Sequence, residues 1–142
     1  MSFETVRAIT DNMRAALESL GLRFAVGAVE KDNATAASML PAGRISYEGE
    51  SFEPTHGERP GYSEAEFGIT VEIRAGDPAE AVTEEQRWAH AVRGSITVDA
   101  LNAGGLAATK RVSRVRVPKA SVANNKESVS LSVRALVRYR VD

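Results

Sequence analysis

The sequence predicts an α+β fold, with an antiparallel or mixed sheet of about five strands and two helices packed on one of its faces. Two long stretches, residues 64–75 and 128–141, place apolar residues at every second position, which is the period of a half-buried strand. The polar positions between them indicate an open side, because a sheet covered on both faces would show continuous apolar runs. Two stretches have helical spacing, and two helices cannot cover both faces of five strands.

The first expected element is a helix over residues 2–20. Ser2 can cap the start of this helix, and Gly21 can adopt the left-handed conformation that ends it. Apolar residues follow the spacing of one helix face: Val6, Ile9, Met13, Leu17 and Leu20. Three short elements are expected next: a strand at residues 22–26, a helical turn at 35–39 and a strand at 44–47.

Residues 48–61 are expected to form a long acidic loop. The stretch contains three glycines, two prolines and almost no apolar residues, and it is longer than the connections of about 4–6 residues that most compact domains use. Loops of this length usually serve a function or are disordered. We expect it to be a docking element, with the following residues available for contact: Glu50, Glu53, His56, Glu58 and Arg59.

The second half of the chain is expected to alternate again between strand and helix. A strand over residues 63–75 ends at Gly76-Asp77-Pro78, and patterns typical of a capping box at Asp77 and Thr83 offer two starts for a helix. Trp88 and Val92 lie on its apolar side, which indicates core packing, and Gly104-Gly105 is expected to end it. The remaining elements are a basic strand at 111–117, a polar turn at 119–126 and a last strand at 127–141, giving the order α-β-β-β-α-β-β.

The 142 residues suit a single domain over 1–142, in which charge is strongly segregated. Residues 48–85 contain eleven acidic and two basic side chains, a net charge of −9, whereas residues 110–142 contain nine basic and two acidic side chains, a net charge of +7. If the strands 63–75 and 127–141 are neighbours, these charges pair across strands. If they are not, the charges are available to another molecule.

The sequence does not predict an enzyme, a cofactor or a metal site. The chain has no cysteine, its two histidines lack the spacing of metal ligands, and no nucleophile elbow or phosphate-binding loop is present. Glu64, Glu66 and Glu72 are carboxylates at strand spacing, which is typical of a solvated face or an interface. No leader segment and no apolar run of about 20 residues is visible, so a cytoplasmic protein is expected.

A basic patch near the end of the chain leaves an alternative open. It consists of Arg111, Arg114, Arg116, Lys119 and Lys126. A small domain that binds a ligand or a nucleic acid could use these residues, but the one aromatic residue in this region, Tyr139, falls on the apolar face, and single-strand binders use aromatic residues for stacking. The pI near 6.2 also argues against a dedicated nucleic-acid binder. Non-specific contact with passing DNA is compatible with the patch.

The order of elements resembles that of the tail terminator proteins of long-tailed bacteriophages. Four segments carry the resemblance: the helix at residues 6–20, the stretch Leu40-Pro41-Ala42-Gly43-Arg44-Ile45, the strand at 67–73 followed by Gly76-Asp77-Pro78, and the strand at 129–141. In that family, helices pack on one face of a mixed sheet and the subunits form a hexameric ring. The ring caps the finished tail tube and then joins the head.

The resemblance implies a structural virion protein of the tail or neck, assembled in the host cytoplasm. Its implied partners are other copies of itself, the tail tube protein and a head-completion or connector protein, with no membrane. Together with the charge segregation, a ring predicts that acidic residues of one subunit face basic residues of the next. The residues expected at this interface are Glu64, Glu66, Glu72, Arg134, Arg138 and Arg140.

Overall fold

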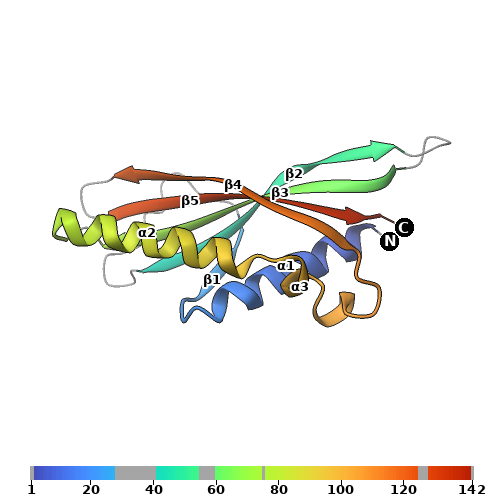
Figure 1. The fold of residues 1–142 in the computed structure, drawn as a ribbon, viewed down its shortest axis with the longest axis horizontal. Helices are drawn as coiled ribbons and strands as arrows, with labels where there is room; N and C mark the ends of the chain where they lie inside the picture. The colour runs from blue at the N-terminus through green and yellow to red at the C-terminus, as the bar shows by residue number, and fades with distance from the viewer. Residues whose placement is uncertain (1, 28–40, 55–59, 75, 125–127, 142) are drawn as a thin grey trace.

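A computed structural model describes residues 2–27, 41–54, 60–74, 76–124 and 128–141, and it confirms the α+β fold (Figure 1). The elements are, in order, helix α1 (Ser2–Glu18), strands β1 (Phe24–Val26), β2 (Ala42–Pro54) and β3 (Pro60–Arg74), helices α2 (Pro78–Ser95) and α3 (Val98–Leu101), the short 3₁₀ helix η2 (Gly104–Leu106), and strands β4 (Val112–Asn124) and β5 (Ser128–Arg140). The predicted order of major helices and strands is therefore confirmed.

The strands form one mixed sheet in the order β1-β2-β3-β5-β4. Strand β1 is parallel to β2, and the other neighbours are antiparallel. β3 and β5 pair along most of their length, from Tyr62 opposite Arg140 to Arg74 opposite Ser128. The two strands with the clearest alternation are thus neighbours at the centre of the sheet.

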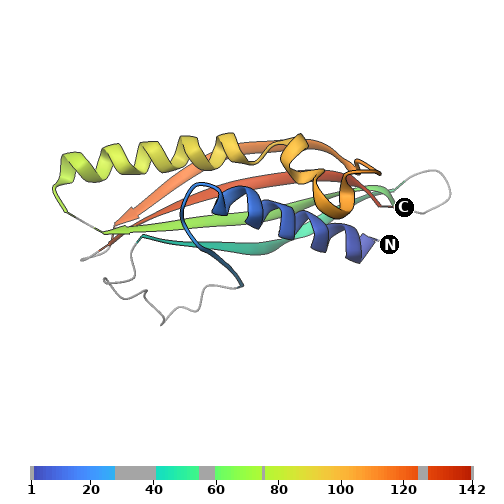
Figure 2. The same cartoon turned by 90° about the horizontal axis from the view of Figure 1, so that it is seen from below.

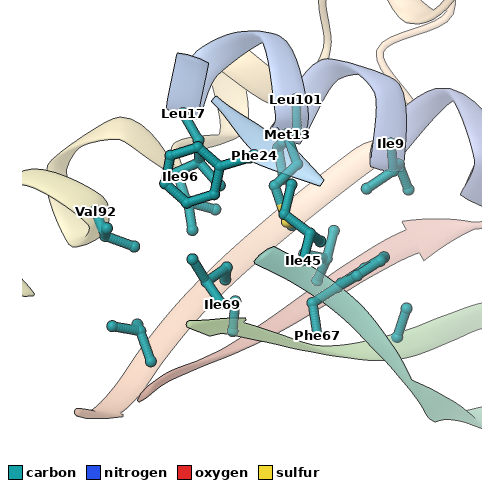
Figure 3. Close-up of a cluster of buried hydrophobic side chains, with 14 of the residues drawn as sticks. Ile9, Met13, Leu17, Phe24, Ile45, Phe67, Ile69, Val92, Ile96 and Leu101 are labelled. Atoms are coloured by element: carbon teal, nitrogen blue, oxygen red, sulfur yellow. The ribbon is translucent and has the colours of Figure 1, made fainter. Parts of the chain in front are cut away.

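Helices α1 and α2 cover the same face of the sheet (Figure 2), as the sequence predicts. Ile9, Met13 and Leu17, spaced along one side of α1, are fully buried against the sheet. Figure 3 shows them in the same cluster as Ile45 of β2 and Phe67 of β3. Burying these side chains supplies the main driving force for the fold, at about 1.5–3 kcal/mol for each large aliphatic or aromatic residue.

The second helix is shorter than predicted. α2 ends at Ser95, because the chain turns at Ile96, which is buried in the core, and the hydroxyl of Thr97 then accepts a hydrogen bond from Ala100 N at 3.1 Å to cap α3. At the start, Pro78 occupies the first turn as predicted, but the Asp77 side chain makes no capping hydrogen bond. Trp88 packs against the core, which confirms its predicted role.

The ends of the first helix agree closely with the prediction. α1 ends at Glu18, two residues before the predicted end. Gly21 follows with a φ of +89°, the left-handed conformation expected of it. The predicted helical turn at residues 35–39 lies outside the described residues.

The predicted acidic loop at 48–61 is wrong over most of its length, because β2 continues to Pro54 and β3 begins at Pro60. Gly49 does not belong to a loop: with a φ of +122° it takes up the irregularity that lies between Tyr47 and Gly49 in the pairing with β3. Glu50 and Glu53 are therefore strand residues. Residues 55–59, with the predicted docking residues His56, Glu58 and Arg59, lie outside the described residues.

The polar turn predicted at 119–126 is also wrong for its first part. β4 continues to Asn124, and the register against β5 shifts between Arg116 and Lys119, around Pro118. A proline is tolerated here because β4 is an edge strand, in which the main-chain N–H groups on the outer side need no partner strand. Among the described helices, none is both long enough and apolar enough to cross a membrane.

Candidate interaction surface

The face of the sheet opposite the helices, called here the open face, presents rows of charged side chains from four strands. Its acidic members come from β2 and β3. Most of its basic members come from β4 and β5, and Arg44 of β2 and Arg74 of β3 lie on the same face near Glu72. The open face contains Glu53, Tyr62, Glu64, Glu66, Glu72, Arg114, Arg116, Lys119, Arg134, Arg138 and Arg140.

Glu64 connects β3 to β4 across the intervening strand β5. Its Oε1 atom accepts a hydrogen bond from Arg116 Nη2 at 3.0 Å, and its Oε2 atom accepts one from Arg114 Nη2 at 3.4 Å. The Glu64 side chain is only 18% exposed, whereas both arginine side chains are about half exposed. Glu64 is therefore the most protected carboxylate among the ion pairs of this face.

Two further ion pairs lie beside it. Arg134 donates to Glu66 Oε1 at 2.8 Å, and this hydrogen bond raises the pKa of Arg134. Arg138 donates to Glu53 Oε2 from Nη2 at 3.0 Å, and the hydrogen bond raises the pKa of Arg138. The guanidinium carbon of Arg138 also lies 3.8 Å from the centre of the Tyr62 ring, a cation–π arrangement.

These contacts show that several of the segregated charges pair with one another within the same chain. Glu64, Glu66, Arg134 and Arg138, all predicted for a subunit interface, are brought together on one sheet, which is the pairing expected if the two strands are neighbours. Glu72 lies opposite Ser130, away from these pairs, and Arg140 lies opposite Tyr62 at the other end. Neutralisation within the chain weakens the case for an interface made by these six residues, which stays a prediction.

The helix-covered face contains a polar cluster that the sequence did not predict. Glu50 Oε2 accepts a hydrogen bond from the hydroxyl of Tyr139 at 2.8 Å and another from the hydroxyl of Ser63. Burial and this bond to Glu50 raise the pKa of Tyr139. Burial and a hydrogen bond to Glu50 also raise the pKa of Tyr47, to about 12. The available signal was that Ser63 and Tyr139 occupy positions of the apolar alternation, where a buried hydroxyl needs a partner.

A shallow groove lies between α2 and β4 on the helix-covered side, called here the basic groove. His90 and Arg93 come from α2, and Lys119 comes from β4. Its other lining residues are small or apolar: Ala89, Val117, Pro118, Ala120 and Val133. None of the described residues that line it is acidic.

The described residues provide no grouping that could hold a metal ion, since no three of their histidine, aspartate or glutamate side chains are gathered closely enough. His90 lies on α2, on the opposite side of the sheet from the ion pairs. The open face is a lattice of charged side chains, several of them in ion pairs.

A scan against protein-family models and a search of curated proteins both found no match to this chain.

Proposed function

We propose that this protein is a structural subunit of a long-tailed phage or prophage tail, acting as a tail terminator at the junction with the head. One observation carries the proposal: α1 and α2 lie on one face of a mixed five-stranded sheet, in the element order on which the resemblance is based (Figures 1 and 2). This arrangement leaves one sheet face and two sheet edges available to neighbouring molecules.

In this proposal the protein works by contact alone, without catalysis or a cofactor. Copies form a ring, a hexamer in the family it resembles, that caps the tail tube and then binds a head-completion or connector protein. The protein would be found in the tail or neck of the virion, and in the host cytoplasm during assembly. DNA passing through such a ring would make only non-specific contacts with it.

The alternative function, binding of a small ligand or a nucleic acid by the basic strands, has less support. Arg114, Arg116, Arg134 and Arg138 are all engaged by glutamates of the same chain. A phosphate would have to displace these carboxylates, which reduces the electrostatic gain that drives non-specific nucleic-acid binding.

The proposal is tested by native mass spectrometry and electron microscopy of the purified protein, alone and mixed with the tail tube protein encoded in the same genome. A ring of six copies, in solution or on the tube end, is the expected result. Disrupting the gene is expected to leave heads and tails that fail to join. A chain that stays monomeric under both conditions, or that binds DNA or RNA tightly at physiological salt, would contradict the proposal.

A further inference from the structure

Strand β2 forms an open edge of the sheet over most of its length. β1 pairs with it at Gly43, Arg44 and Ile45, and within the described residues no strand pairs with residues 46–54 on that side. In Figure 1 the end of β2 that leads to β3 lies apart from α1. The opposite edge of the sheet is β4. A sheet with two open edges presents unpaired main-chain groups on both sides.

The main-chain groups at the β2 edge point toward a possible neighbour. Ile45 O accepts from Gly27 N at 2.9 Å and Gly43 N donates to Arg23 O at 3.3 Å, so these two residues direct their main-chain groups away from β3. Successive residues of a strand direct their main-chain N–H and C=O groups alternately to one neighbouring strand and the other, just as their side chains alternate between the two faces of the sheet. The residues of the free edge that share the face of Ile45 are Tyr47, Glu50 and Phe52, as their register with β3 shows.

Two aromatic side chains lie along this edge without cover. Tyr47 is 54% exposed, although its ring contacts Phe67 edge to face and its hydroxyl bonds to Glu50, and Phe52 is 62% exposed. Edges that must remain single usually carry lysine or proline to prevent pairing. Residues 46–53 contain neither, since the one proline of this edge is Pro54 at its end, and their only charged residues are Glu48, Glu50 and Glu53. The edge therefore combines exposed aromatic rings with negative charge.

The other edge has the complementary chemistry. β4 contains Arg114, Arg116 and Lys119 and no acidic residue. Beside it, on the helix-covered side, lies the basic groove, with His90 and Arg93 above an apolar floor. Pro118 removes one main-chain donor, so pairing would use the main chain on either side of it.

We propose that copies of this chain associate head to tail, the β2 edge of one copy docking on the β4 edge of the next. The two sheets become continuous, and because faces are preserved across a continuous sheet, Phe52 enters the basic groove. There its ring packs on Ala89, Val117 and Ala120 near a guanidinium, an arrangement typical of interface anchors. Glu48 approaches Lys119 of β4; neither forms an ion pair within the described residues, whereas Glu53, Arg114 and Arg116 are already paired within the chain. This interface rests on the proposed function, since it names the surfaces that would join the subunits of the ring.

Two single substitutions test the interface from its two sides. Phe52→Lys places a charge at the β2 edge, and Ala120→Lys fills the basic groove; both positions are exposed, so each variant is expected to keep the fold, checked by circular dichroism. Each should weaken association about tenfold or more, measured by sedimentation velocity over a range of concentrations. Val82→Lys, which changes a 50% exposed valine on α2, is the matched control and should associate as the wild type does.

Mixing the two variants gives the sharper result. Each retains one intact edge, so a head-to-tail interface predicts that an equimolar mixture forms 1:1 dimers and nothing larger, whereas each variant alone stays monomeric. If the wild type forms rings and both variants do so equally well, this interface is overturned while the proposed function stands. A wild type that is monomeric in solution also overturns it, and the proposed function is then decided by whether rings form on the tail tube.

Discussion

At the scale of single residues, the cluster around Glu50 is the least expected feature of the protein. A carboxylate from an edge strand receives hydrogen bonds from Tyr139 and Ser63, two hydroxyls placed at buried positions of the central strands. A hydroxyl buried without a partner costs about 1–3 kcal/mol. The cluster therefore joins the second half of β2 to β3 and β5 through hydrogen bonds between buried polar groups, and not through apolar contact.

Removing the Tyr139 hydroxyl tests this link. Tyr139→Phe deletes one donor to Glu50 while keeping the ring in the core, and we expect the free energy of unfolding to fall by about 1–2 kcal/mol, measured by urea denaturation. Tyr62→Phe is the matched control, because its ring remains available to Arg138 on the open face. Equal losses in the two variants would show that the bond to Glu50 adds nothing to stability.

The tyrosines of this cluster also predict how stability depends on alkaline pH. The pKa of Tyr47 is raised from 10 to about 12, so between about pH 10 and 12 the unfolded chain loses this proton while the folded chain keeps it. Unfolding is then favoured, and stability falls as the pH rises through this window. We expect a shallower fall in Tyr47→Phe, measured as unfolding free energy against pH. Curves that are parallel to that of the wild type would contradict the assigned shift.

At the scale of elements, the ion pairs of the open face fasten β4 to β3 across β5. Glu64→Gln removes the carboxylate that serves Arg114 and Arg116, and we expect a loss of about 0.5–1 kcal/mol in unfolding free energy, since the arginines are half exposed. Glu72→Gln, on the same strand and face, is the control: it forms no ion pair with the described part of the chain. The difference between the two should shrink in about 1 M salt, where charges are screened within about 3 Å.

The same elements show how far the sequence could predict the fold and the site. β3 and β5 were predictable because their alternation is continuous, and once they are neighbours their outward charges must meet. The second half of β2 was not, because Gly49 and Pro54 are typical of loops and the strand forms through pairing with β3. Because the second half of β2 was predicted as a loop, the sequence could predict neither the hydrogen bond between Tyr139 and Glu50 nor the open edge of β2. The break after α2 was hidden because Ile96 fits the helical spacing while belonging to the core.

At the scale of the whole molecule, the charge segregation along the chain has two consequences. The acidic middle and basic end meet within one sheet, where β3 pairs with β5, so much of the opposite charge is neutralised internally. What remains is distributed between the two sheet edges, with β2 acidic and β4 basic. A molecule with unlike edges is suited to head-to-tail association, which closes into a ring when the rotation between copies allows.

The hairpin that joins β2 to β3 provides a last prediction at this scale. Glu53 lies opposite Tyr62, so replacing residues 54–60 by one asparagine creates a two-residue Asn-Gly turn with Gly61, the sequence that a tight hairpin favours. We expect the fold and its unfolding free energy to be retained, because every strand pair up to Glu53 remains. If the hairpin docks on the tail tube or a neighbouring subunit, ring assembly on tubes, observed by electron microscopy, should fall sharply. Rings that form as well as with the wild-type chain would show that His56, Glu58 and Arg59 have no docking role, and an unfolded variant would show that this segment belongs to the domain's own core.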